Sequence, residues 1–166
     1  KGDFKSVYGN VSEGMDEVAT AITGVRVSLD LTGKPLREMS QRMVQLSTLT
    51  NSDLEGNIRS VARAFQDWDV PVRNQTKTLD AFFRLSQAGG GTVSDLADSV
   101  QKFGSPLRTL GFDLADAASM FASFEKAGVN TQTMVPGLKF AIANMSAPTA
   151  DLAEKLKQLG VNANDP

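Results

Sequence analysis

The sequence predicts an all-α protein, a bundle or short solenoid of about seven to eight helices built from repeated helix pairs of about 40 residues. Three observations predict this fold class. Apolar residues recur every three or four positions along most of the chain, the spacing that places them on one face of a helix. No run alternates apolar and polar residues between hairpin turns, as a β-strand would. The chain also matches itself when it is shifted by about 40 residues.

The N-terminal part predicts three helices. The stretch SEGMDEVATAITGV, residues 12–25, indicates the first. Pro35 marks the start of the second, because proline fits the first helical turn, where its missing N–H is not needed. The second helix has an apolar face of Leu36, Met39, Met43 and Leu46. Ser52 and Glu55 form the capping box of the third helix. The apolar face of the third helix is Leu54, Ile58, Val61, Phe65 and Trp68.

Further helices follow the same plan. One carries Leu79, Phe82 and Phe83 and runs to Ala88, where Gly89 can take the left-handed conformation that ends helices. The next apolar face, closed by Gly128, is Leu114, Ala118, Phe121 and Phe124. A segment from about residue 133 to 145 and a short helix, capped by Thr149 and stopped by Gly160, complete the set. Four prolines are expected at or near helix starts or breaks: Pro71, Pro106, Pro136 and Pro148.

The internal repeat is the most informative pattern. A shift of 42 residues places Leu54, Ile58, Val61, Phe65, Trp68 and Val70 on Leu96, Val100, Phe103, Leu107, Leu110 and Phe112. The same shift places the cap Ser52-Asp53 on Ser94-Asp95. A shift of 39 places Met15 on Leu54 and Gly89 on Gly128. Since neither helix of a pair can bury its apolar face alone, we expect Phe65 and Leu107 to be buried against neighbouring units.

Composition excludes several classes of function. Lysine and arginine number 17 against 19 acidic residues, a net charge of −2, so no basic field attracts nucleic acid or an anionic membrane. The chain has no cysteine and no histidine, which removes thiolate and imidazole metal ligands, cysteine nucleophiles and a histidine general base. No run approaches the roughly 18 apolar residues that cross a bilayer. We therefore expect no catalytic, cofactor-binding or metal-binding residues, and no cofactor.

Three consecutive glycines, Gly89 to Gly91, precede a predicted helix start in QAGGGTVSDLADSV, where many proteins bind phosphate. A phosphate loop also needs a preceding strand and a lysine after the last glycine, whereas here a helix precedes and Thr92 follows. The corresponding stretches of the neighbouring units, TLTNSD and GVNTQT, are not rich in glycine. We favour a helix C-cap at Gly89 followed by two linker residues that tolerate serine. The alternative is an anion-binding site at the helix N-terminus that occurs in this repeat unit and not in its neighbours.

Acidic side chains provide a second candidate site. Asp113, Asp116 and Glu125 lie along one predicted helix, and paired carboxylates can perform acid–base catalysis. Asp113 stands at an N-cap and Asp116 in the first turn, where negative charge interacts favourably with the helix dipole, which favours capping. An enzyme would need a cleft glutamate with a raised pKa. All six glutamates are expected at helix surfaces or in first turns: Glu13, Glu17, Glu38, Glu55, Glu125 and Glu154.

Trp68 and the methionines have both a structural and a binding interpretation. Trp68, the one tryptophan, could stack on a ligand, but its counterparts in the repeat are leucines, so a place in the core is favoured. The six methionines could line an adaptable peptide groove, but five lie on the apolar faces, which favours core packing. These are Met15, Met39, Met43, Met120, Met134 and Met145.

Two long segments and the C-terminal stretch carry a resemblance to a known family. The segments are VATAITGVRVSLDLTGKPLREMSQRMVQLSTLTNSDLEGNIRSVARAFQDWDVP and LDAFFRLSQAGGGTVSDLADSVQKFGSPLRTLGFDLADAASMFASFEKAGVN, and the stretch is APTADLAEKLKQLGVN. In order and spacing they resemble the core region of phage tail tape measure proteins, also called phage-related minor tail proteins. The similarity covers about residues 11–162. The stretch from Trp68 to Pro71 departs from the pattern, since glycine is more typical there.

The resemblance implies a structural role and no enzymatic activity. It implies a helical core domain at 11–162 between a flanking segment, 1–10, and a tail, 163–166. Tape measure proteins set tail length while the tube polymerises around them in the host bacterial cytoplasm, and they lie in the virion tail. Their implied partners are tail tube and tail-tip proteins, tail assembly chaperones and further copies in the tail lumen, with no nucleic acid and no membrane bound by this domain. A helical-repeat interaction module of a non-phage scaffold is the alternative, and a tail-linked peptidoglycan hydrolase is a third class.

Overall fold

The computed structural model describes Asp3, Val7 and residues 14–129, 131–146 and 150–158. Eight helices follow one another in these ranges, and the described residues contain no strand. They are α2 (Met15–Leu29), α3 (Gly33–Thr50), α4 (Leu54–Asp67), α5 (Val72–Gly89), α6 (Val93–Thr109), α7 (Leu114–Lys126), α8 (Thr131–Ser146) and α9 (Ala150–Gln158). The predicted all-α class is confirmed. The predicted cap Thr149 and stop Gly160 lie outside the described residues.

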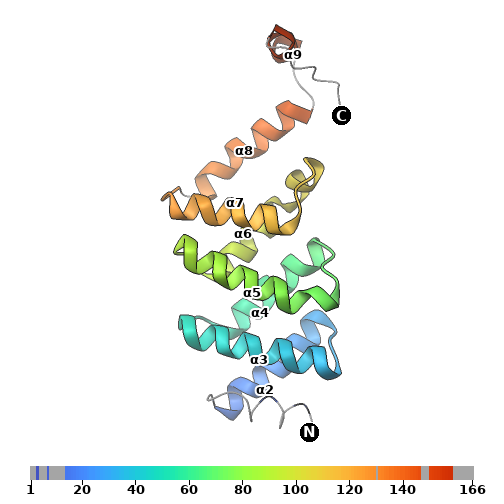
Figure 1. The fold of residues 1–166 in the computed structure, drawn as a ribbon, viewed down its shortest axis with the longest axis vertical. Coiled ribbons are helices and arrows are strands. Elements are labelled where there is room, and N and C mark those ends of the chain that lie inside the picture. The colour runs from blue at the N-terminus through green and yellow to red at the C-terminus, as the bar shows by residue number, and fades with distance from the viewer. Residues whose placement is uncertain (1–2, 4–6, 8–13, 130, 147–149, 159–166) are drawn as a thin grey trace.

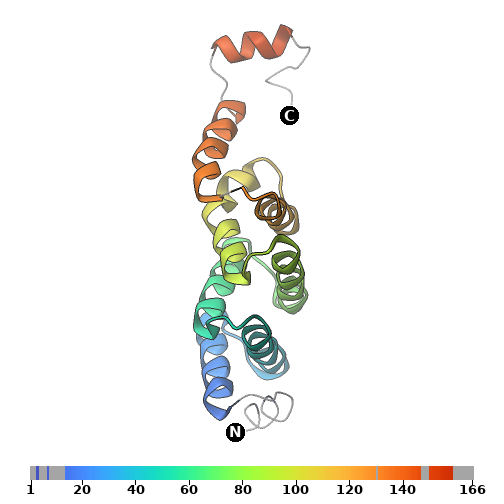
Figure 2. The same cartoon turned by 90° about the vertical axis from the view of Figure 1, so that its left-hand side faces the viewer.

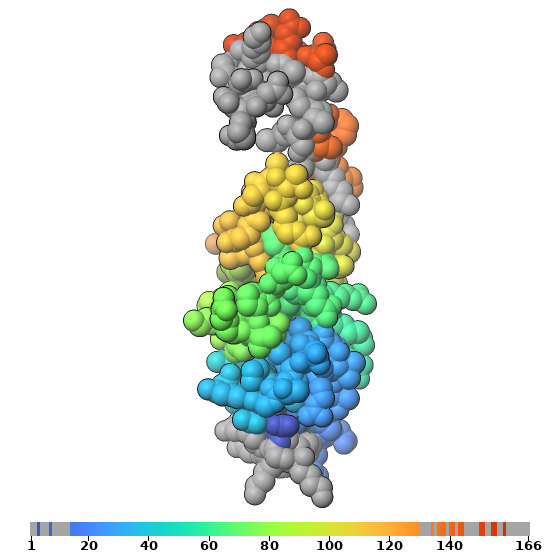
Figure 3. All heavy atoms as spheres, turned by 90° about the vertical axis from the view of Figure 1, so that its right-hand side faces the viewer, coloured from blue at the N-terminus to red at the C-terminus, as the bar shows by residue number. Residues whose placement is uncertain are grey.

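The helices alternate between two layers. Helices α2, α4 and α6 pack in sequence in one layer, and α3, α5 and α7 pack in sequence in the other. Figure 1 shows the pairs stacked along the long axis of the molecule, and Figure 2 shows the two layers side by side. Figure 3 shows the same order on the surface, from blue near α2 to orange near α7. Helix α8 contacts α6 and α7, and Figure 1 shows α9 beyond α8.

Helix starts and ends recur at a nearly constant interval. Helices α2, α4 and α6 begin 39 residues apart, at positions 15, 54 and 93, and α3 and α5 begin 39 residues apart, at 33 and 72. Left-handed residues follow six successive helices: Asp30, Asn51, Asp69, Gly90, Gly111 and Gly128. Helix α6 has 17 residues and α4 has 14, so the interval is 39 at their starts and 42 after their ends. This difference explains why both shifts match in the sequence.

Two predicted N-caps were wrong by one or two residues. The carboxylate of Asp53, not the hydroxyl of Ser52, accepts the first-turn N–H of α4, from Gly56 at 2.8 Å. At α6 the cap is Thr92, whose Oγ1 accepts from the Asp95 N–H at 3.0 Å. Ser94 instead pairs with Ser60 of α4, with their hydroxyl oxygens 2.9 Å apart. Capping depends on which side chain reaches the free N–H groups, which residue type alone does not decide.

One apolar core runs through the two layers. Phe65 of α4 packs on Phe82 of α5 with ring centroids 6.3 Å apart, and Phe103 of α6 packs on Phe121 of α7 at 5.6 Å. The side chains of Phe65 and Leu107 are 2% and 1% exposed, which confirms that both are buried. The predicted faces of α3 and α5 also point into this core. Side-chain packing between the layers, rather than any one cap, therefore joins the helix pairs.

Some predicted core and break positions were wrong. Met15 is 61% exposed, and Leu110 is also exposed, although their repeat partners Leu54 and Trp68 are partly buried. Met39 and Met43 are buried as predicted, Met120 and Met134 are partly buried, and the side chain of Met145 lies outside the described residues. Pro71 caps α5 as expected. Pro106 and Pro136, however, lie inside α6 and α8, and Pro148 lies outside the described residues.

Candidate functional site

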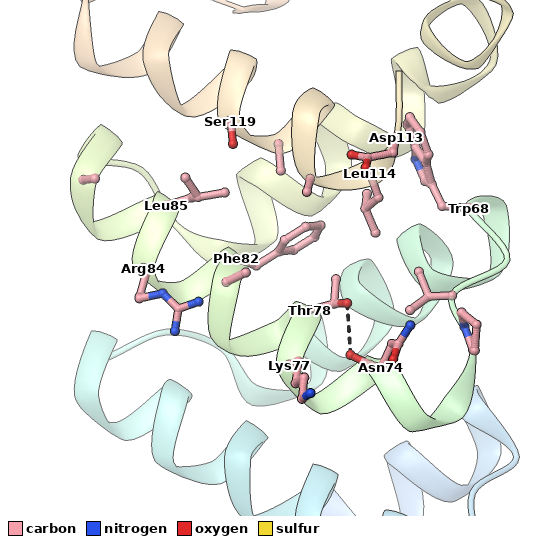
Figure 4. Close-up of a pocket in the computed structure, with 16 residues that line it drawn as sticks. Trp68, Asn74, Lys77, Thr78, Phe82, Arg84, Leu85, Asp113, Leu114 and Ser119 are labelled. Carbon is pink, nitrogen blue, oxygen red and sulfur yellow. Dashed lines mark hydrogen bonds between the residues drawn. The ribbon is translucent and has the colours of Figure 1, made fainter. Parts of the chain in front are cut away.

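A groove of about 840 Å³ lies between α5 and α7 and is called here the α5–α7 groove. Phe82 and Leu85 come from α5, Leu114 comes from α7, and Figure 4 shows these three apolar side chains between the two helices. Small residues widen the groove on both sides: Ala81, Ala88, Ala115, Ala118 and Ser119. The groove therefore combines an apolar floor with space that no side chain of its own helices fills.

Trp68 closes one end of the groove, beside Asp113 and Leu114 (Figure 4). Its indole Nε1 donates to the carbonyl oxygen of Val100 in α6 at 3.0 Å. The guanidinium of Arg108 lies 5.2 Å from the ring centroid, and it also donates to the carbonyl oxygen of Asp67. The prediction that Trp68 is a core residue was wrong in part, because the side chain is half-buried and one part of it lines the groove.

Polar and charged groups lie along the α5 side of the groove. Lys77 and Arg84 both line it, and both are exposed. Asn74 and Thr78 lie on the same helix, and the Thr78 hydroxyl donates to the Asn74 carbonyl oxygen at 3.0 Å (Figure 4). On the α7 side, Asp113 contributes one carboxylate. Two cations against one anion make this rim locally positive in a chain of net charge −2.

Asp113 and Asp116 form a reciprocal cap at the start of α7, as predicted for Asp113. The Asp113 carboxylate accepts from the Asp116 N–H at 2.8 Å, and the Asp116 carboxylate accepts from the Asp113 N–H at 3.5 Å. Both carboxylates therefore satisfy N–H groups that the helix leaves free. Glu125 lies at the other end of α7, so the structure does not bring the three acidic residues together.

The three consecutive glycines have three different structural roles. Gly90, not Gly89 as predicted, takes the left-handed conformation, with φ at +84°. Gly89 is the last residue of α5, and a Cβ there would lie 2.9 Å from the Ala122 carbonyl oxygen of α7. A Cβ on Gly91 would lie 2.5 Å from Glu125 Oε2. The glycines thus permit a turn and a close approach of α5 to α7, and a description of Gly90 and Gly91 as free linker is wrong.

A second hollow, of about 420 Å³, lies beside these glycines. It is lined by the carboxylates of Asp95, Asp98 and Glu125 and by one cation, Lys102. Asp95 Oδ2 already accepts from the Thr92 hydroxyl at 2.6 Å and from the Thr92 N–H at 3.3 Å. An excess of negative charge disfavours a phosphate here. Among the described residues no group of three or more acidic, histidine or cysteine side chains is arranged to hold a metal ion.

Glu125 differs from the expected surface glutamate. Its side chain is half-buried, and Oε2 is buried without a hydrogen-bond partner. Burial raises the pKa of the Glu125 carboxyl above its ordinary value of 4.5, and the nearby Asp95 carboxylate raises it further. Four other glutamates are exposed: Glu17, Glu38, Glu55 and Glu154. Glu13 lies outside the described residues.

Sequence reasoning missed the α5–α7 groove and its cationic rim. The signal was present, because a shift of 39 residues places Arg42 on Ala81 and Asp80 on Ser119. Arg42 and Asp80 form an ion pair across α3 and α5, with the nitrogen and oxygen 3.4 Å apart. Because Ala81 and Ser119 are small, the space between α5 and α7 stays open where an ion pair fills it between α3 and α5.

Three comparisons with known proteins bear on identity. A family model described as phage-related minor tail protein matches residues 8–165. No curated protein matches the chain. No solved structure matches it either. No helix in the described ranges is both long enough and apolar enough to span a membrane.

Proposed function

The chain belongs to the phage-related minor tail protein family, a family of structural phage tail components, and from this premise we propose that it is a helical domain of a tape measure protein. In this role the protein sets the length of the tail and supports its assembly. The observation that carries the proposal is the family match, which extends over almost the whole chain, residues 8–165. The stacked helix pairs support it, because a repeated unit can be lengthened or shortened without a change of fold.

The proposed partners are other components of the tail. Tail tube and tail-tip proteins and tail assembly chaperones are the proposed contacts, together with self-association in the tail lumen. Assembly takes place in the host bacterial cytoplasm, and the protein then lies in the virion tail. A helical-repeat module of a non-phage scaffold is the alternative, and the phage family match favours the tail.

One observation bears on a second candidate function, peptidoglycan hydrolysis. Burial raises the pKa of the Glu125 carboxyl, and the Asp95 carboxylate raises it further, which is the direction of shift found in a general acid. We propose that neither residue is catalytic, because the Asp95 carboxylate is engaged by Thr92 at the start of α6. Incubation of the purified protein with peptidoglycan tests this point. We expect no release of soluble fragments, and release that Glu125→Gln abolishes would contradict the proposal.

A stop codon early in the gene tests the tail role. In a phage or prophage with this stop codon, we expect lysates without normal tails. A plasmid copy of the intact gene should restore the tails. Electron microscopy of the lysate provides the count of tails. Mass spectrometry of purified tails provides the second measurement, since a tail component must be present in them. Normal tails in normal number from the interrupted gene would refute the proposal.

A further inference from the structure

The α5–α7 groove has a filled counterpart within the same chain. The equivalent position between α3 and α5 contains a hollow of only about 80 Å³, lined by large side chains that include Leu46, Leu79 and Phe83. Although α7 begins 42 residues after α5, the linings of the two hollows match at a shift of 39, which places Leu79 on Ala118. The same shift places Phe83 on Ala122. The space between α3 and α5 is therefore nearly closed, whereas the space between α5 and α7 is open. The size of the side chains accounts for the difference.

The charges along α3 and along α5 also differ. On the α3 side, Lys34 pairs with Glu38 at 3.6 Å, and Arg42 pairs with Asp80 of α5. The shift of 39 residues places Lys77 on Glu38, and Ser119 on Asp80, so both acidic partners are lost. Lys34 corresponds to Arg73, whereas Arg42 corresponds to Ala81. The α5 rim therefore keeps one cation of the α3 rim, gains a second at Lys77 and has neither acidic partner.

Three cations lie along the rim of α5. Arg73, Lys77 and Arg84 are exposed, and their spacing of four and seven residues places them on one side of the helix. None of the three forms an ion pair with another residue in the described part of the chain. The groove therefore presents an apolar floor beside a row of cations without partners.

We propose that the α5–α7 groove binds an acidic amphipathic helix of another protein, with apolar residues on the floor and carboxylates against Lys77 and Arg84. The lining residues of α5 extend from Asn74 to Ala88, which at 1.5 Å per residue is about 21 Å, or four helical turns. A helix that buries residues at every third or fourth position fits a groove of this shape. This inference goes beyond the proposed function and holds whether or not the protein sets tail length.

The test uses a synthetic helical peptide of about 18 residues, long enough to hold a helix when bound, with leucines on one face and glutamates beside them. Trp68 is the one tryptophan and lines the groove, so its emission reports binding directly. Anisotropy of the labelled peptide provides an independent affinity. We expect saturable binding, and at least tenfold weaker binding when lysines replace the glutamates of the peptide.

Variants of the protein locate the site. The double variant Lys77→Glu with Arg84→Glu changes exposed residues, so the fold is retained, and it should bind the glutamate peptide at least tenfold more weakly. The same variant should gain affinity for the lysine peptide. Arg63→Glu, an exposed change on α4, is the matched control and should leave binding unchanged. Ala81→Arg with Ser119→Asp recreates the Arg42–Asp80 pair in the groove and should abolish binding while circular dichroism stays unchanged.

Three results would overturn the proposal. The first is no saturable binding of the glutamate peptide by the unaltered protein. The second is binding as tight as that of the unaltered protein by the charge-reversed variant, Lys77→Glu with Arg84→Glu, or by the filled variant, Ala81→Arg with Ser119→Asp. The third is a dimer of the unaltered protein in light scattering that the filled variant loses, because the groove would then be occupied by a second copy.

Discussion

The indole Nε1 of Trp68 lies 3.0 Å from the carbonyl oxygen of Val100, to which it donates a hydrogen bond from the end of α4 to the middle of α6. The indole lies against Gly104, where a Cβ would be 2.9 Å from Nε1 and 3.1 Å from Cε2. Gly104 of α6 therefore leaves the space that the indole of Trp68, the residue after α4, occupies. This contact fixes one end of the α5–α7 groove.

Gly104→Ala should displace the indole of Trp68. Alanine favours a helix by about 1 kcal/mol over glycine, but the new Cβ would overlap a ring packed on the helix, so we expect a net loss of stability. A lower Tm together with a shifted tryptophan emission would agree with this expectation. Gly137→Ala in α8 is the control, since nothing lies within 4 Å of its Cβ. An emission spectrum unchanged from that of the parent would show that Trp68 does not lie on Gly104.

Truncation of core residues should affect the whole stack. Phe65→Ala and Leu107→Ala should each lower the free energy of unfolding by about 2–5 kcal/mol, because each removes a buried side chain and leaves a cavity. Urea unfolding followed by circular dichroism measures the change. Leu49→Ala is the control, since its side chain is 74% exposed and should contribute little. Comparable losses in all three variants would argue against one core shared by the helix pairs.

The three glycines before α6 should differ in their response to alanine. Gly90→Ala places a side chain at φ +84° and should cost about 1–2 kcal/mol. Gly89→Ala should also destabilise, because its Cβ would meet the Ala122 carbonyl oxygen, which is held by α7. Gly91→Ala should cost least, since the end of the Glu125 side chain can move away. Thermal melts of the three variants check this order, and a Gly90→Ala protein as stable as the parent would contradict the cap assignment.

Glu125 should make stability depend on pH. Since burial and the Asp95 carboxylate raise its pKa in the folded protein, folding favours the protonated form. The stabilising effect of the proton is therefore present below the ordinary value of 4.5 and is lost as the pH rises through the raised pKa. Glu125→Gln should raise Tm at pH 7, and the gain should shrink toward pH 4. The exposed Glu154→Gln is the control, and a gain from Glu125→Gln that is independent of pH would rule out this linkage.

The faces of the helices could be predicted from the sequence, whereas their ends could not. Phe65 and Leu107 were identified because apolar spacing near 3.6 residues reports burial directly. The cap at Asp53 and the left-handed Gly90 depend on backbone geometry that neighbouring candidates such as Ser52 and Gly89 could equally adopt. Residue type narrows a cap or a left-handed position to two or three neighbouring residues, and it does not show which of them takes that role.

The candidate site was harder to predict, because it depends on contacts between helices distant in sequence. The small side chains Ala81 and Ser119 acquire meaning only when α5 is known to pack on α7. Trp68 was placed in the core from its leucine counterparts, but its Nε1 donates to the Val100 carbonyl oxygen of α6 and the half-buried side chain lines one end of the groove. The raised pKa of Glu125 likewise arises from burial beside Asp95, across α6 and α7.

Tail length in electron micrographs tests the length-setting role most directly. A second copy of residues 54–92 placed after Thr92 adds one helix pair, and both junctions keep a capping residue before an α-helix, since Thr92 caps α6 and would cap the new α4. At 1.5 Å per residue the 39 added residues would lengthen one continuous helix by about 58 Å, whereas one stacked pair adds about 10 Å. We expect phage that carry this gene to have uniformly longer tails, with an increase between about 10 Å, for a stacked pair, and about 58 Å, for a continuous helix. Normal numbers of tails at the parental length would contradict the account.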